Sequence, residues 1–322
     1  MMIKRITVLL IGMILTGALL QGCRFMIVAP LGRLATEPRT QLDDIERETD
    51  VQIALGVDYD DLYIDGEWLF WDDYLEENGI NGRVEETFCV IRGKVWVLVS
   101  EKEQEVVKWS IAVIELSSGK VDIMCSKTVN EKALEENVKE KKTVKWEDRK
   151  GSGIKGWETA EFSERTSYYY NGRIVLSDYK EVLEYDLRTG DRTEWRFEDY
   201  PFPKAAIHAE RDASEDAILF RRGTEEKKLT LNRAIDTSSA FKKMKEVADS
   251  FHSSSQEERF LYRIVTAEDS VYVLSPISNR SGTIHMMIYQ YDFEKNQLLY
   301  VKKVYFFEPA DSGRCYVVPI IE

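Results

Sequence analysis

The sequence has few of the residues from which metal centres, disulfide scaffolds and many catalytic sites are built. Its three histidines, His208, His252 and His285, do not have the spacing of a metal-ligand pair. Its four cysteines, at positions 23, 89, 125 and 315, are too few and too scattered for a disulfide framework or a zinc site. No glycine-rich phosphate loop follows an expected strand, and Gly-x-Ser-x-Gly is absent. The sequence therefore identifies no catalytic residue, no metal ligand and no cofactor.

The chain carries more negative than positive charge. The 44 Lys and Arg residues are outnumbered by 57 Asp and Glu residues, which gives a formal net charge of -13. An acidic body repels nucleic-acid phosphates, so we expect no nucleic-acid partner. Apolar residues make up 43% of the chain, which is enough for a substantial core, so disorder of the chain as a whole is not expected.

The most specific motif is at the N-terminus. Lys4 and Arg5 precede an uncharged run of 15 residues, from Ile6 to Leu20, and Leu20-Gln21-Gly22-Cys23 follows directly. This order resembles the signal sequence of a bacterial lipoprotein, in which a branched apolar residue stands three positions before the lipidated cysteine and a small residue directly before it. Gln21 departs from the small or apolar residue that is usual at its position.

The resemblance to lipoproteins implies cleavage before Cys23, a diacylglycerol thioether on Cys23, and a location at the extracytoplasmic face of the cell membrane. Two acyl chains, at about 0.8 kcal/mol per buried methylene, give durable anchoring. The alternative is an uncleaved membrane helix, but the apolar run is shorter than the roughly 18 to 20 residues that a span needs, and Arg24 interrupts its extension. We expect a signal peptide over residues 1–22, a charged tether over 23–50 and a folded domain over 51–322.

From residue 62 onward, short apolar or alternating runs separated by Gly, Asn and Asp predict β-strands joined by tight turns. The clearest example spans residues 168–191, which reads as short strands divided by turns at Asn171-Gly172 and Arg188-Thr189-Gly190. Similar patterns predict strands within residues 62–71, 88–99, 109–125, 217–220, 271–274 and 286–305. The repetition indicates one structural unit used several times along the chain.

Two short motifs end a strand of this unit, Tyr185-Asp186-Leu187-Arg188-Thr189-Gly190 and the looser Tyr291-Asp292-Phe293-Glu294-Lys295-Asn296. They resemble the strand ends in the blades of bacterial β-propeller repeat proteins. The resemblance implies an all-β, β-propeller-like domain, with five to seven irregular blades at about 40 to 50 residues per blade. Because the turns are unevenly spaced, an irregular β-sandwich is the alternative.

Two segments depart from the strand pattern. Between residues 238 and 251, Phe241, Met244, Val247 and Phe251 recur every three or four positions, which predicts one inserted amphipathic helix packed on the sheet edge. Residues 131–150 are dominated by charge and predict a solvated loop or a short exposed helix.

The densest group of aromatic and acidic residues contains Trp68, Trp71, Asp72, Asp73 and Tyr74. Aromatic faces beside carboxylates suit sugar rings, so these five residues are the candidate ligand-binding group. As members of one strand, however, the two tryptophans would point to opposite faces. Core packing is therefore the favoured interpretation for part of the group.

Two other groups have a structural interpretation beside a functional one. Asp58, Asp60, Asp61 and Asp65 do not follow the alternation of a calcium loop, and a solvated acidic turn is favoured. Cys89 and Cys125 are expected on neighbouring strands, where they would either form a disulfide or remain buried free thiols, and Cys315 has no assigned redox state.

These observations predict a membrane-anchored lipoprotein that acts as a binding or scaffolding module for an envelope protein or a glycan. The alternative is a glycan hydrolase or lyase on a propeller fold. That alternative requires two carboxylates about 5 to 9.5 Å apart in one cleft, and sequence alone does not reveal such a pair.

Overall fold

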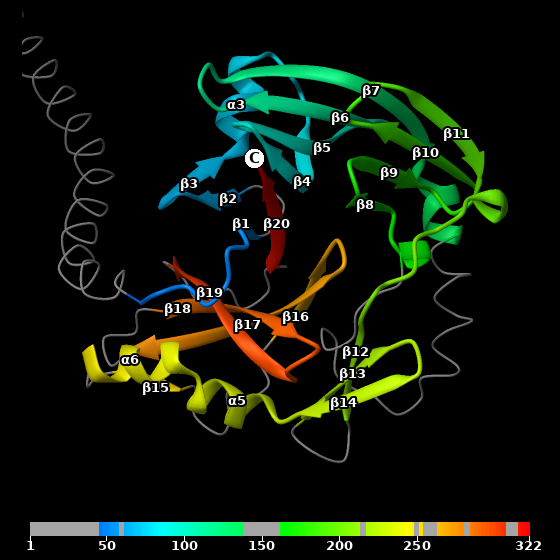
Figure 1. Ribbon diagram of the computed structural model, residues 1–322. Coiled ribbons are helices and arrows are strands. Elements are labelled where there is room, and N and C mark those ends of the chain that lie inside the picture. Colours follow the sequence, from blue (N-terminus) through cyan, green and yellow to red (C-terminus); the bar gives the residue numbers. More distant parts are fainter. Residues whose placement is uncertain are drawn as a thin grey trace, which may run out of the picture.

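The computed structural model describes residues 45–57, 61–137, 162–212, 217–247, 251–253, 263–279, 284–306 and 315–322. These segments are mainly β-strands arranged in four hydrogen-bonded sheets, and the all-β prediction is confirmed (Figure 1). The expected signal peptide, Cys23 and most of the expected tether lie outside the described residues. Residues 45–50 of that tether contact the body: Ile45 is buried, and the Glu48 backbone N–H donates to the carbonyl of Tyr300 at 2.9 Å.

The largest sheet contains strands from both ends of the described chain. Its eight strands run in the order β3-β2-β1-β20-β4-β5-β6-β7, and the sheet is curled like half a barrel (Figure 1). β20 pairs antiparallel with the whole of β1, and parallel with β4 through two residue pairs only. The strands are β1 (Ile53–Val57), β2 (Asp61–Ile64), β3 (Glu67–Phe70), β4 (Arg83–Ile91), β5 (Lys94–Glu103), β6 (Val106–Glu115), β7 (Lys120–Asn130) and β20 (Cys315–Ile321).

Three smaller sheets complete the fold, and every strand pair within them is antiparallel. The second sheet contains β8 (Ser167–Tyr170), β9 (Arg173–Ser177), β10 (Glu181–Asp186) and β11 (Arg192–Arg196). The third contains β12 (His208–Asp212), β13 (Ala217–Arg222) and β14 (Glu225–Leu229). The fourth contains β15 (Phe251–Ser253), β16 (Arg263–Ala267), β17 (Ser270–Asn279), β18 (Ile284–Asp292) and β19 (Gln297–Phe306).

The tight turns form where the sequence predicts them. Asn171 and Gly172 join β8 to β9 with φ values of 46° and 77°, and Arg92 and Gly93 join β4 to β5 with 50° and 72°. Two consecutive positive φ values define the hairpin turn whose twist matches that of the flanking strands. Glycine in the second position meets this requirement without steric cost, so local sequence determines these hairpins.

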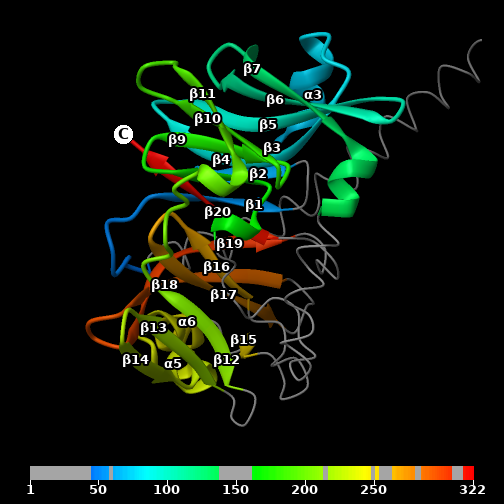
Figure 2. The same cartoon turned by 90° about the vertical axis from the view of Figure 1, so that its right-hand side faces the viewer.

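The sheets pack face to face around the middle of the molecule (Figures 1 and 2). Trp96 and Ile111 of the first sheet pack with Ile174 and Leu183 of the second in one buried cluster. A second cluster joins β1 and β20 to β17, β18 and β19. The third sheet packs on the fourth, where the rings of Phe220 and Tyr291 stack with centroids 3.6 Å apart.

The predicted amphipathic helix forms, but it is shorter than expected. α6 (Ser239–Val247) follows α5 (Leu231–Thr237), and Phe241 is buried while Lys242 and Lys243 are exposed. Phe251, predicted to lie on the same helix, instead begins β15 and pairs with Asn279 of β17. Hydrogen bonding to the sheet therefore outweighs the helical periodicity at that position.

The prediction that Trp71 ends a strand is wrong. β3 ends at Phe70, and Trp71 is the first residue of α3 (Trp71–Glu77), with Asp72 and Asp73 in its first turn, where carboxylates interact favourably with the helix dipole. Residues 131–137 are also helical, which fits the expected short helix at the start of the charged segment. Among the helices of the described segments, none combines the length and apolar character that a membrane crossing requires.

Candidate functional site

A cavity of about 230 Å³ lies where β4, β8, β16 and β20 meet. We call it the central cavity. The four strands come from distant parts of the chain, and each brings one short stretch to the cavity wall. The lining residues are Glu86, Thr87, Phe88, Arg165, Tyr168, Tyr169, Ile264, Val265, Thr266, Ala267, Glu268, Tyr316, Val317 and Pro319.

Sheet topology explains why this wall is polar. β8 is the last strand of its sheet, β16 pairs with β17 alone, and β4 contacts β20 through only two residue pairs. Strand edges with unpaired backbone groups therefore face one another here, and side chains bridge them. The Arg165 guanidinium donates from Nη2 to Thr266 Oγ1 at 2.5 Å, and the Ser167 hydroxyl donates to Glu86. Arg165 also lies 5.0 Å from the ring centroid of Phe162.

Glu268 is a carboxyl group of the cavity whose pKa is raised. It lies in the β16–β17 turn, half-buried, and one of its carboxylate oxygens accepts the Asn171 backbone N–H at 3.2 Å. Loss of hydration on burial raises the pKa of Glu268, the Asn171 hydrogen bond opposes the rise, and the charge of Asp269 adds to it. A carboxyl in this state can exchange a proton or accept a hydrogen bond more readily than one on the open surface.

Tyr169 and Cys89 are close enough to Glu268 to be affected by its charge. Burial is the main cause of the raised pKa of the Tyr169 hydroxyl, and the charges of Cys89 and Glu268 add to it. The pKa of the Cys89 thiol is raised well above its usual value, again mainly by burial and secondarily by Glu268. A thiol with a raised pKa is protonated at neutral pH and is a poor nucleophile. Cys89 is thus a packing residue.

The chemistry available at the central cavity is hydrogen bonding. One guanidinium, two carboxyl groups and aromatic rings line a space that fits one sugar ring or one side chain of a partner. Its volume lies below the roughly 300 to 1,000 Å³ of drug-sized ligand pockets. In the part of the chain that the structure describes, no group of three or more His, Cys, Asp or Glu residues is arranged to hold a metal ion.

The two cavity carboxyls are bound near opposite ends of β8. Glu86 accepts from Ser167, whereas Glu268 accepts from Asn171, four residues further along. At about 3.3 Å per residue these anchor points are roughly 13 Å apart. That separation is larger than the roughly 5 to 9.5 Å between the carboxyls of glycosidases.

The candidate residues from the sequence do not form one ligand platform. Trp71 is completely buried at the start of α3, and the half-buried ring of Tyr74 on the same helix lies beside it with centroids 5.8 Å apart. Trp68 belongs to a different cluster, where its ring packs on Tyr63 at 5.2 Å. The remaining two members, Asp72 and Asp73, are exposed to solvent.

None of the described cysteine and histidine side chains, which are those of Cys89, Cys125 and His208, lines the central cavity. β5 and β6 separate Cys89 on β4 from Cys125 on β7, so the predicted placement on neighbouring strands is wrong and both are free thiols. His208 is half-buried on β12. Side chains outside the described set include those of His252, His285 and Cys315.

The acidic segment before β2 is described only in part. Asp58 and Asp60 lie outside the described residues, and Asp61 begins β2. Asp65 is exposed in the β2–β3 turn with a φ of 50°. A short polar residue at this turn position is consistent with the favoured interpretation of an acidic turn.

Sequence reasoning missed the polar residues of the central cavity. Arg165 and Thr266 are 101 positions apart, and no local pattern connects them. The one usable signal was at Glu268 and Asp269, which the sequence marks as the turn of a repeat. Turns at equivalent positions of repeated units gather at one end of a repeat fold, and the Asn171 and Glu268 turns do meet.

No protein-family model matches the chain, and no curated protein matches it. Among solved structures, the crystal structure of the N-terminal domain of Nup159 matches with 10% sequence identity. That match covers 82% of this chain and 70% of the other, with a TM-score of 0.16. A TM-score this low indicates neither a shared fold nor a shared function.

Proposed function

We propose that this chain is a lipid-anchored binding module of the cell envelope, and that a glycan or a segment of an envelope protein binds at the central cavity. The observation that carries the proposal is the convergence of four strand edges on a cavity with Arg165 on one wall and Glu268 on another. Such a wall offers donors and acceptors to a neutral polar ligand. The buried, protonated thiol of Cys89 offers no nucleophile.

The proposed body is an irregular propeller of five blades. The blades are β20 with β1–β3, β4–β7, β8–β11, β12–β14 and β16–β19. Pairing of C-terminal β20 with N-terminal β1 supports this arrangement, because a blade assembled from both chain ends closes a ring of sheets. The lining of the central cavity also supports the five-blade arrangement. It is formed by β20, β4, β8 and β16, and each of these is the innermost strand of its proposed blade.

The β12–β14 blade is the source of the irregularity. It has three strands, and it packs outward on the fourth sheet through Phe220 and Tyr291. The segments around β8 and β16 therefore contact each other: Arg165, which precedes β8, bonds to Thr266 of β16, and Asn171 bonds to Glu268 between the two adjoining turns. A displaced blade of this kind explains a central cavity that is small for a propeller channel.

The proposed anchor is Cys23, with residues 1–22 removed. Support comes from the order of charge, apolar run and Leu20-Gln21-Gly22-Cys23 in the sequence. Mass spectrometry of membrane-extracted protein tests it, with a Cys23→Ser variant as the control. Wild type should carry the mass of a diacylglyceryl cysteine at its new N-terminus, and retention of residues 1–22 on an unmodified Cys23 would contradict the anchor.

A glycan hydrolase on the same fold is the second candidate. The raised pKa of Glu268 favours it, because a general acid must hold its proton near neutral pH. The distance of roughly 13 Å estimated between the anchor points of Glu86 and Glu268 opposes it. Binding therefore agrees better with the geometry than hydrolysis does.

The binding proposal can be tested with peptidoglycan fragments and envelope polysaccharide in affinity electrophoresis, and with membrane proteins in a pull-down. Glu268→Gln changes the charge and proton donor of the cavity, while Glu194→Gln makes the same change on exposed β11. We expect the cavity variant to lose at least about fivefold in affinity, the value of one hydrogen bond of about 1 kcal/mol, and the control to keep wild-type affinity. Equal affinities for the two variants would contradict the proposal.

A further inference from the structure

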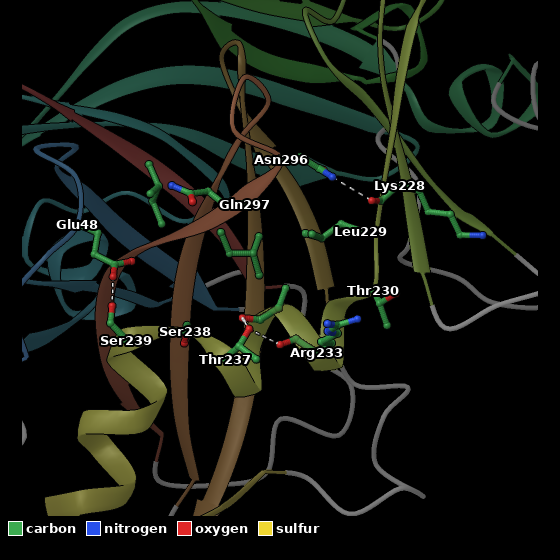
Figure 3. Close-up of a pocket in the computed structure, with 13 residues that line it drawn as sticks. Glu48, Lys228, Leu229, Thr230, Arg233, Thr237, Ser238, Ser239, Asn296 and Gln297 are labelled. Carbon is green, nitrogen blue, oxygen red and sulfur yellow. Dashed lines mark hydrogen bonds between the residues drawn. The ribbon is translucent and has the colours of Figure 1, made fainter.

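A second cavity, of about 530 Å³, lies beside β19 and is separate from the central cavity (Figure 3). We call it the lateral cavity. The end of β14, helix α5 and the start of β19 form its walls, and Glu48 lies at one end. Its volume is within the roughly 300 to 1,000 Å³ of ligand pockets. Apart from Leu229, Ala234, Leu298 and Leu299, its lining is polar or charged.

The open edge of β19 forms one wall of the lateral cavity. β19 is the last strand in the order β15-β17-β18-β19, so only one of its edges is paired within the sheet. Tyr300 shows how the other edge is used: its backbone N–H donates to Glu48 Oε2 at 2.8 Å, and its carbonyl accepts from the Glu48 N–H at 2.9 Å. Both backbone groups of Tyr300 therefore point away from β18.

The backbone of Leu298 points the same way as that of Tyr300. Residues two apart in a strand direct their N–H and C=O groups to the same side. The register of Leu298, Leu299 and Tyr300 against β18 is continuous, so this alternation holds over the three residues. No described residue bonds to the outward N–H or C=O of Leu298. Its side chain, 7% exposed, is buried in the core, so only its backbone edge is presented to the cavity.

An outward N–H and C=O pair in one strand residue is complementary to the backbone of an extended peptide. The protein already uses this edge in that way two residues further on, where the Glu48 N–H bonds to Tyr300. A sugar or a lipid headgroup would not present a donor and an acceptor at strand spacing in the plane of the sheet. The geometry thus selects an extended peptide over other polar ligands.

The charge of the cavity wall adds a preference for the peptide side chain. Arg233 of α5 lines the cavity, is exposed, and forms no ion pair with any described residue. Lys228, on the same wall, is held 2.8 Å from Asp212. An uncompensated guanidinium favours a carboxylate on the incoming chain.

We propose that the lateral cavity binds an extended peptide carrying an acidic side chain, which adds as a strand to the open edge of β19 at Leu298 and places its carboxylate near Arg233. This site is distinct from the central cavity, and either can exist without the other.

Two substitutions at the same position test the backbone contact in the full chain. Leu298→Pro and Leu298→Ala both remove the branched end of the buried side chain, but only proline removes the N–H. Because that N–H faces the open edge, proline does not break the ladder to β18. The probe is the peptide acetyl-Thr-Val-Thr-Glu-Thr-Val amide, titrated by calorimetry.

We expect the peptide to bind the Ala variant saturably and the Pro variant at least about fivefold more weakly, which corresponds to one lost hydrogen bond of about 1 kcal/mol. A second arm needs no variant: a peptide N-methylated at alternate backbone nitrogens should lose binding to wild type. In wild type, the unmethylated peptide should also slow hydrogen exchange of the Leu298 amide. Equal affinities of the peptide for the Ala and Pro variants, or no saturable binding of the unmethylated peptide to wild type, would overturn the proposal.

Discussion

The ring of Tyr316 lies directly over the backbone of Gly56, its cross-strand partner in the β1–β20 pair. A Cβ atom at Gly56 would lie 2.2 Å from Cζ of that ring. The Tyr316 hydroxyl accepts the Thr87 backbone N–H of β4 at 3.1 Å. One tyrosine thereby joins β1, β20 and β4, the three strands through which the chain ends close on the first sheet.

Gly56→Ala should destabilise the fold by about 1 to 3 kcal/mol, because the added methyl group displaces the Tyr316 ring from a packed interface. Urea denaturation followed by tryptophan fluorescence measures the change. In a Tyr316→Ala background the same glycine substitution should cost less than half as much, since the obstructing ring is gone. Equal costs in the two backgrounds would show that the contact does not explain the glycine.

Lys127 connects the first and second sheets. It is 8% exposed on β7, and its Nζ lies 3.1 Å from Asp178 and donates to the Glu181 carbonyl at 3.2 Å, both before or at the start of β10. Lys127→Met should lower the free energy of unfolding by about 1 to 3 kcal/mol, because it leaves these acceptors without their donor. The exposed Lys120→Met on the same strand should change the free energy of unfolding by less than about 0.5 kcal/mol. Similar costs for the two lysines would contradict the proposed role of Lys127.

The lowered pKa of Lys302 predicts that the free energy of unfolding rises at alkaline pH. Its amine donates to the Ile53 carbonyl, and burial lowers the pKa of Lys302 to about 8 from a usual value of about 10.5. Between these two pH values the folded state binds fewer protons than the unfolded state, so the free energy of unfolding increases with pH. Below pH 8 the contribution is constant.

The comparison of wild type with Lys302→Met isolates that contribution from other groups that titrate in the same range. The wild-type free energy of unfolding should gain on that of the variant between pH 8 and pH 10, and the difference should be flat between pH 6 and pH 7. Chemical denaturation at four pH values suffices. A difference that falls with rising pH would be inconsistent with a lowered pKa for Lys302.

The two described cysteines should both react as free thiols, at different rates. Burial raises the pKa of the Cys125 thiol to about 11, and it also raises the pKa of the more deeply buried Cys89 thiol well above its usual value. Both residues should therefore react slowly with a thiol reagent in the native protein at pH 7, and Cys89 should react more slowly than Cys125. Mass spectrometry after alkylation in denaturant without reductant should find both modified, whereas a mass that matches a Cys89–Cys125 disulfide would refute the strand order.

Local sequence predicted the hairpins because their requirements are local. Asn171 with Gly172 and Arg92 with Gly93 supply the positive φ values of a tight turn, and the flanking apolar runs supply the strands. The sequence predicts a strand at Trp71 because an aromatic residue after β3 continues the strand pattern. Its burial at the start of α3 depends on a core cluster whose members include residues more than 20 positions away, such as Val97 and Ile114.

The central cavity was beyond local reasoning for the same reason. The contacts of Arg165 with Thr266 and of Asn171 with Glu268 each join segments about 100 residues apart. They depend on how the sheets pack, and on β20 pairing with β1, which no turn or periodicity specifies. Repetition of the strand unit predicted an all-β fold, while the position of each functional group follows from tertiary packing.

Photo-crosslinking tests the central claim, that a ligand occupies the central cavity, most directly. A photoreactive amino acid replaces Thr266 in the cavity, or Thr193 on exposed β11 as the control, in the full chain within intact cells. If a ligand occupies the cavity, one discrete adduct, a glycan or a single envelope protein, should form from position 266 and be absent from position 193. The same products from both positions, or none from position 266, would contradict it.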